Sequence, residues 1–210
     1  MGGGRVMLFD KDDYPVTFDE RYTVSDLEPY SFVRPGALAG ANFSFRRSAL
    51  EKIGEIGPEL GAGTPFPCED IDAVAAVAWA GMKSTFDPRP VVFHHHGRKL
   101  ADLPALLAGY DRGRGAYFAK YILQRDSRAA YLQGWICERF TDVHRGSLAT
   151  LGCELVSVQN YLICRGKFGA LVLSMPIAFG FFAALALKIT FYKVVPAQRS
   201  QASVAQHNRD

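Results

Sequence analysis

The chain has 210 residues, of which 24 are basic and 21 acidic, so that its formal net charge is +3. This length suits one ordinary domain with an appendage, and such a chain buries roughly 70% of its unfolded surface without disulfides or structural metals. The basic residues are scattered rather than gathered among aromatic ones, which argues against a nucleic-acid partner.

The four cysteines do not have the spacing of a metal or redox motif. Cys68, Cys137, Cys153 and Cys164 form no two-residue pair of the kind that zinc knuckles need. No basic region followed by an apolar core precedes them in residues 1–10. We therefore expect reduced thiols, a cytosolic environment and no export signal.

Residues 1–39 are rich in glycine, proline, aspartate and tyrosine and show little periodicity. They are predicted to form loops and short strands without a glycine-rich phosphate loop. Asp10, Asp12 and Asp13 resemble a cation site, but a turn that ends at Pro15 explains them more simply.

Residues 40–67 lead to an acidic cluster. Gly40, Ala41 and Asn42 precede the paired Arg46 and Arg47, and a short helix over 48–52 is predicted to stop at Gly54. Residues 56–67 contain three glycines and three prolines, which predicts a loop. Such a loop can bring the backbone close to a ligand.

A buried helix is predicted from Glu69 to Gly81, because its body is apolar on nearly every side. Its first turn contains Glu69, Asp70 and Asp72. Carboxylates are stabilised there by the helix dipole, typically by about 0.3–1 kcal/mol each. The acids therefore have a structural explanation as well as a catalytic one.

Two short strands are predicted next, over 84–86 and 91–96, separated by Asp87, Pro88 and Pro90. Side chains alternate along a strand, so His94 and His96 point to one face and His95 to the other. Two imidazoles on one face suit a divalent cation, whereas an exposed polar strand end is the alternative. The residues alone do not decide between these two interpretations.

Taken in order, these pieces resemble the acceptor-side half of family 2 glycosyltransferases over residues 36 to 125. The matching segments are 40–50, 61–65, 69–72 and 91–96, with 109–115 and 119–121 also counted. Each is weak alone, whereas four in this order are more specific. The resemblance implies an α/β class and a partial GT-A-like sandwich within residues 1–100. It also implies inverting transfer of a sugar from a nucleotide donor.

The resemblance also implies roles for individual residues. Asp70 would be the base that deprotonates the acceptor hydroxyl, with Glu69 beside it holding the acceptor or orienting the loop. Asn42, Arg46 and Asp72 would contact substrate. A Mg²⁺ or Mn²⁺ ion would stabilise the leaving diphosphate, and His94 or His96 would bind it.

The family's nucleotide-binding half, with its Asp-x-Asp motif, is missing from the matched stretch. We therefore expect a truncated enzyme, or a subunit whose partner chain supplies the donor site. The expected ligands are a nucleotide sugar and a polysaccharide or lipid-linked acceptor.

The remainder of the chain is predicted to be helical and membrane-associated. Residues 101–165 show helical periodicity, with aromatic residues that suit a helix core or the surface of a bilayer. Within 166–195, residues 168–187 carry no charge and predict one transmembrane helix. The tail 196–210 is predicted to be disordered. We expect the plasma (inner) membrane, with the catalytic region cytoplasmic.

A second hypothesis needs no catalysis. The chain would be a non-catalytic, membrane-anchored interaction protein derived from such an enzyme. Its acids would cap a helix, and its histidines would lie on the surface.

Overall fold

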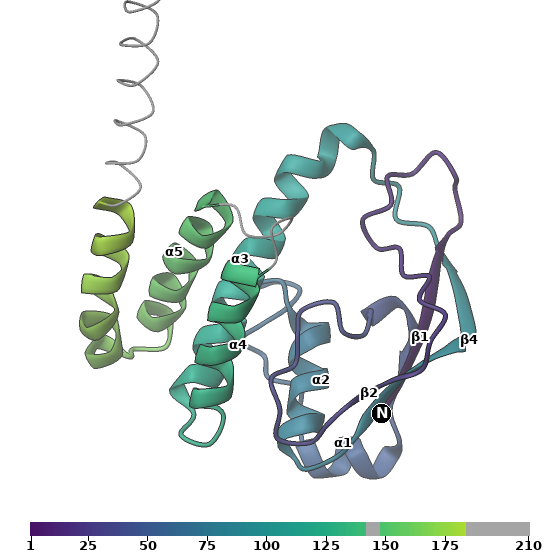
Figure 1. Ribbon diagram of the computed structural model, residues 1–210, viewed down its shortest axis with the longest axis horizontal. Helices are drawn as coiled ribbons and strands as arrows, with labels where there is room; N and C mark the ends of the chain where they lie inside the picture. Colours follow the sequence, from purple (N-terminus) through teal and green to yellow (C-terminus); the bar gives the residue numbers. More distant parts are fainter. Residues whose placement is uncertain (142–147, 184–210) are drawn as a thin grey trace, which may run out of the picture. The chain divides into compact units, whose positions relative to one another are not determined.

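The computed structural model describes residues 1–141 and 148–183 (Figure 1). The chain divides into two compact units, Met1–Tyr161 and Leu162–Asp210. The first unit contains a mixed four-stranded sheet with strand order β2-β4-β1-β3. Its strands are β1 (Gly2–Leu8), β2 (Ser25–Leu27), β3 (Phe43–Ser44) and β4 (Ser84–His94). The α/β class therefore describes this unit.

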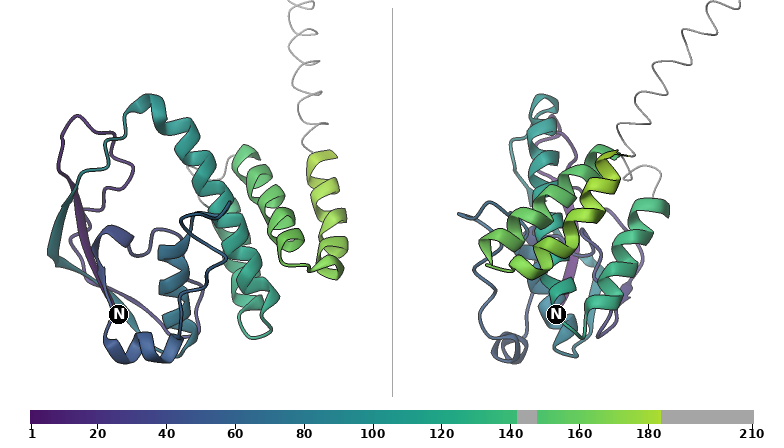
Figure 2. Two further views of the ribbon diagram at one scale, coloured as in Figure 1. Left: turned by 180° about the vertical axis from the view of Figure 1, so that it is seen from behind. Right: turned by 90° about the vertical axis from the view of Figure 1, so that its left-hand side faces the viewer.

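The two long strands, β1 and β4, run parallel at the centre of the sheet. Their register pairs Leu8 with His94, so both strands end at the same edge. As a result, the loop after β1 lies beside the residues that follow β4 (Figures 1 and 2). Pairing between strands so far apart in the sequence is not visible in local patterns.

The prediction of two separate strands around residues 84–96 was wrong, because β4 is continuous from Ser84 to His94. Its pairing with β1 jumps from Gly3↔Phe86 to Arg5↔Val91, so the residues between Phe86 and Val91 bulge out of the ladder. Pro88 and Pro90 lie in this bulge and have no N–H for a ladder hydrogen bond. Proline therefore distorts the strand here without ending it.

The helices of the first unit follow the predicted pattern closely. α1 (Arg47–Ile53) ends at Gly54, whose positive φ and backbone N–H close the last turn onto Leu50. α2 (Glu69–Trp79) begins at the predicted residue. α3 (Leu103–Leu123) and α4 (Arg128–Thr141) follow, and α5 (Leu148–Cys164) runs across the boundary between the two units. α2 lies between the sheet and α3 (Figure 1 and the left panel of Figure 2).

Several aromatic residues of α3 and α4 belong to the core. Tyr117, Tyr121 and Tyr131 are buried, and the hydroxyls of Tyr117 and Tyr131 are 2.7 Å apart. Lys120 of α3 pairs with Asp72 at 2.8 Å. Arg128 donates to the carbonyl of Ile122. The helical periodicity therefore reflected packing.

The predicted fold class is wrong in its transmembrane helix. Among the described residues, no helix combines the length and the apolar character that crossing a membrane requires. Residues 168–183 are helical, and at 1.5 Å per residue they extend about 24 Å, against roughly 30 Å of hydrocarbon. Residues 184–187 of the predicted span, and the tail 196–210, lie outside the described residues. The partial sandwich is likewise replaced by one mixed sheet with helices.

Candidate functional site

Three predicted motif segments meet at the first turn of α2. Glu69 is exposed there, Asp70 is partly buried and Asp72 is buried. The short 3-10 turn η1 (Gly40–Asn42) packs on Asp70, and the loop that begins at Gly61 packs on Glu69. The acid pair therefore has a glycine-containing segment against each of its two members.

Asp70 is held in place by backbone groups. The N–H groups of Ile71, at 2.7 Å, and of Gly40 donate to its carboxylate. A Cβ placed on Gly40 would come 2.8 Å from the Cβ of Asp70, so a side chain does not fit at position 40. This contact places the Gly-Ala-Asn segment directly against the acid pair.

The loop beside Glu69 is a compact turn. Gly61 donates its N–H to the carbonyl of Phe66 at 2.8 Å, and Thr64 donates its hydroxyl to the carbonyl of Gly61 at 2.8 Å. Gly61 has a φ of 118°, and a Cβ there would come 2.8 Å from the Cβ of Glu69. Only glycine combines this backbone conformation with this close approach.

The environment of Asp70 favours proton transfer. Burial, followed by the nearby charge of Glu69, raises the pKa of the Asp70 carboxyl, while the N–H donors of Ile71 and Gly40 oppose the shift. Among the described residues no salt bridge reaches Asp70. A partly exposed carboxylate with a raised pKa is suited to act as a general base.

Asp72 has a different environment although it lies in the same turn. Its side chain is 1% exposed and accepts a hydrogen bond from the Lys120 ammonium at 2.8 Å. Lys120 also pairs with Glu59 at 3.3 Å. Burial raises the pKa of Asp72, and the charge of Lys120 opposes the rise. These contacts link α2 to α3. Because the Asp72 carboxylate is buried and paired, we do not assign it the substrate-binding role that the resemblance implied.

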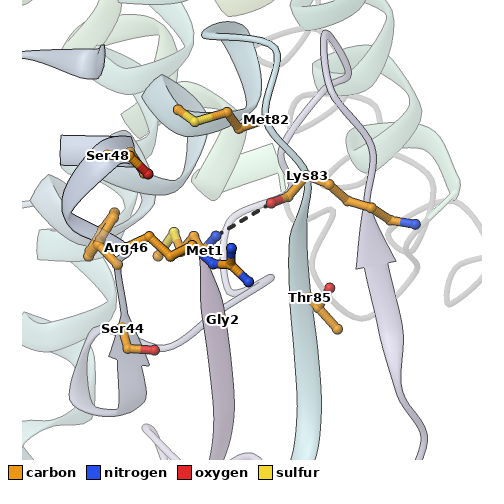
Figure 3. A pocket seen from close by; sticks show the side chains of 10 residues that line it. Met1, Gly2, Ser44, Arg46, Ser48, Met82, Lys83 and Thr85 are labelled. Atoms are coloured by element: carbon orange, nitrogen blue, oxygen red, sulfur yellow. Dashed lines mark hydrogen bonds between the residues drawn. The ribbon is translucent and has the colours of Figure 1, made fainter. Parts of the chain in front are cut away.

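The described side-chain contacts of Asn42 and Arg46 are to groups other than the acid pair. The Asn42 amide donates to the carbonyls of Arg5, at 2.8 Å, and Pro90, at 3.2 Å, and so ties η1 to both central strands. Arg46 lines a pocket of about 540 Å³ at the start of β1, together with Met1, Ser44 and Thr85 (Figure 3). Asp70 is not among the residues that line this pocket.

The histidines do not join the acid pair. The ring centroids of His94 and His96 are 5.6 Å apart, although β4 ends at His94, so the predicted strand over 91–96 was too long and His96 lies beyond it. The described residues form one group of three potential metal ligands, and it consists of Asp10, Asp13 and His95. Neither Asp70 nor the two predicted metal ligands belong to it.

His94 and His96 differ in their ability to bind a metal. The Arg98 N–H donates to His96 Nδ1 at 2.9 Å, so we infer that the proton of this neutral ring is on Nε2, which is buried without a partner among the described residues. His94 Nδ1 lies 3.2 Å from the Thr17 hydroxyl. If Nδ1–H donates to Thr17, His94 can offer Nε2 to a cation. In that tautomer His94 can bind a metal through Nε2, whereas His96 cannot.

An ammonium group occupies the acidic cluster that sequence analysis assigned to a turn. Lys99 Nζ lies 2.9 Å from Asp13 and 3.3 Å from Asp10. Asp13 also accepts the Gly97 N–H at 2.9 Å. The Lys99 hydrogen bond holds the pKa of Asp13 below its usual range. Because the Lys99 ammonium already contacts both carboxylates and offsets one of their two charges, we interpret this cluster as an ion-pair network rather than a metal site.

Sequence reasoning missed Tyr110, which lies on α3 near the acid pair. Burial, followed by the charge of Asp70, raises the pKa of the Tyr110 hydroxyl, and Arg98 opposes the shift. One turn later, Gly113 packs directly on Pro67, just before α2. The glycines of α3 were the available signal, because a helical glycine marks a close backbone approach.

No protein-family description, curated protein or solved structure matches this chain. The resemblance to family 2 glycosyltransferases therefore rests on the motif residues alone, and the geometry around Asp70 has to be judged by its own chemistry.

Proposed function

We propose that this chain is the acceptor-side half of an inverting glycosyltransferase in which Asp70 is the general base. The observation that carries the proposal is the environment of Asp70. Its carboxylate is partly exposed, oriented by two backbone N–H groups and without a cation among its described neighbours, and its pKa is raised. These are the properties that a base for a sugar hydroxyl needs.

The proposed reaction is a single displacement. As the acceptor oxygen attacks the anomeric carbon, its proton moves to an Asp70 carboxylate oxygen, and the bond from that carbon to the diphosphate oxygen breaks. The configuration at the anomeric carbon inverts because attack and departure occur on opposite faces. A raised pKa strengthens Asp70 as a base.

The neighbours of Asp70 have separate roles in this proposal. Glu69 is exposed beside the Gly61 loop, where its carboxylate orients the acceptor and raises the pKa of Asp70. Asn42 acts indirectly, since its amide holds η1 against β1 and β4 and so keeps the Gly40 N–H on Asp70.

The donor requires groups beyond those described here. A nucleotide sugar is the proposed donor, and a polysaccharide or lipid-linked hydroxyl is the proposed acceptor. A partner chain or a further segment would bind the nucleotide. A Mg²⁺ or Mn²⁺ ion, with His94 as one ligand, would offset charge on the leaving diphosphate.

The test is sugar transfer by the chain mixed with a donor-binding partner, measured with labelled nucleotide sugars and polysaccharide or lipid-linked acceptors. Asp70→Asn should lower the rate by about 10²–10⁴-fold, the usual contribution of a general base. Its thermal midpoint should not fall, because the amide removes a partly buried charge.

Asp126→Asn is the matched control, because Asp126 is an exposed carboxylate between α3 and α4. It should transfer sugar at the wild-type rate. Wild-type turnover by Asp70→Asn would show that Asp70 is not the base. Loss of turnover in both variants would point to a general defect.

The non-catalytic interaction protein remains the second candidate, favoured by one observation. The described residues place no imidazole in a metal-ligating group with Asp70. Calorimetric titration with Mn²⁺ and a panel of nucleoside diphosphates separates the two candidates, because the interaction protein should bind none of them, with or without a partner chain.

A further inference from the structure

The helical residues 168–183 expose a continuous apolar stripe. Seven large side chains on this stretch are between 41% and 77% exposed. Leu173 and Ile177 lie on one side of the helix, and the stripe on the other side consists of Phe168, Val172, Met175, Phe179 and Phe182. At 3.6 residues per turn the residues of the stripe fall within an arc of about 80° around the helix axis. Apolar patches of this kind mark surfaces that bind a partner or a membrane.

The stripe offers no hydrogen-bonding group to a partner. Ser174 is the only residue between 168 and 183 with a polar side chain. Its hydroxyl already donates to the carbonyl of Leu171 at 2.8 Å. Protein interfaces carry about one hydrogen bond per 100–200 Å² and a polar rim. A hydrocarbon surface requires neither, so this chemistry favours lipid over protein.

The charges beside the stripe favour an anionic surface. Between residues 155 and 183, Arg165 and Lys167 are the only charged side chains. Both are exposed, and both lie just before the stripe begins. Cations next to an apolar helix face are typical of segments that lie in the headgroup region of acidic bilayers.

We propose that residues 165–183 dock on the surface of an anionic phospholipid bilayer, with the stripe in the interface and Arg165 and Lys167 on the headgroups. In this proposal residues 168–183 lie in the plane of the interface. This inference goes beyond sugar transfer and does not depend on it. It places the chain at the membrane, where lipid-linked acceptors are found.

The test is cosedimentation of the full chain with vesicles of phosphatidylcholine and phosphatidylglycerol in equal parts. Phe179→Glu should weaken partitioning at least about ten-fold, because it inserts a charge into the apolar face. Arg165→Gln and Lys167→Gln should each weaken it roughly five-fold, and pure phosphatidylcholine should remove this difference. Alkaline carbonate should release the bound protein.

Ile136→Glu is the matched control, because Ile136 is an exposed apolar residue on α4. It should bind vesicles like the wild type, and Phe179→Leu should retain binding. Equal binding by Phe179→Glu and wild type would overturn the proposal, as would retention of the chain after carbonate. Self-association in sedimentation velocity without lipid, abolished by Phe179→Glu, would instead identify a second copy as the occupant. Sugar transfer to a soluble acceptor is a separate readout, which Phe179→Glu should leave unchanged.

Discussion

The first unit has two places where carboxylates are shielded from water, here called its two corners, and the carboxylates there differ in their partners and in the direction of their pKa shifts. At the end of β1 and β4, Asp13 accepts hydrogen bonds from Lys99 and Gly97, and its pKa is lowered. At the start of α2, Asp70 accepts only backbone N–H groups among its described contacts, and its pKa is raised. A carboxylate paired with a cation stabilises a fold, whereas one left without a cation is available for proton transfer.

Asp72 repeats this contrast only two residues from Asp70. Burial raises the pKa of both carboxyls, but a lysine ammonium contacts Asp72 alone. The helix turn thus exposes one acid towards the loops and directs the other to α3. The assignment of Asp70 as the base depends on this difference in partners rather than on the acidic motif itself.

The largest expected effect is that of Lys120→Met. It leaves Asp72 buried without its cation, and removing one partner of a buried ion pair typically costs about 3–5 kcal/mol of unfolding free energy. Urea denaturation followed by circular dichroism measures the change. Lys83→Met is the control, because Lys83 and its partners Asp26 and Glu28 are exposed, and little change is expected.

The double variant Lys120→Met with Asp72→Asn sharpens this test. If the cost comes from the uncompensated carboxylate, the amide should recover most of the lost stability. A double variant no more stable than Lys120→Met would show that the lysine stem, and not its charge, supports the contact between α2 and α3.

The acid pair at the start of α2 could be predicted from the sequence, whereas the ion pair of Asp13 and Lys99 at the end of β1 and β4 could not. The apolar run after Glu69 and the glycines around positions 40 and 61 are local signals, and they correctly placed the acid pair at a helix start beside loops. Asp13 meets Lys99 and His96 only because β1 pairs in parallel with β4. That register depends on residues more than eighty positions apart, and no local pattern encodes it.

The error at the C-terminal helix has a related cause. A run of apolar residues predicts that the segment avoids water, but it does not identify what the segment contacts. Hydropathy alone therefore did not distinguish a membrane span from an exposed apolar face. Likewise, the prolines at 88 and 90 predicted a break between strands, but pairing on both sides of the bulge keeps β4 continuous.

A moderate effect is expected for Gly40→Ala. The new methyl group would overlap Asp70, and overpacking of this kind typically costs about 1–3 kcal/mol. The displaced η1 turn should also withdraw the Gly40 N–H from the carboxylate and lower transfer. Thermal melting and transfer assays measure the two effects. Gly109→Ala is the control, because a Cβ there has no neighbour closer than 3.9 Å. Equal melting of the two variants would argue against the close packing at position 40.

The smallest effect is expected for Lys99→Met, which removes the ammonium that pairs with Asp10 and Asp13. The folded-state pKa values of Asp10 and Asp13 are lowered, so the ionised carboxylates stabilise the fold above their unfolded pKa of about 3.9. This contribution is lost as the pH falls through the lowered folded values. At neutral pH Lys99→Met should therefore be less stable than the wild type, and below about pH 4 the two should converge. Thermal midpoints measured from pH 7 down to pH 3 check this. A difference that stays constant over the whole range would mean that Lys99 contributes through packing of its stem, and the contrast between the two corners would then not be one of charge.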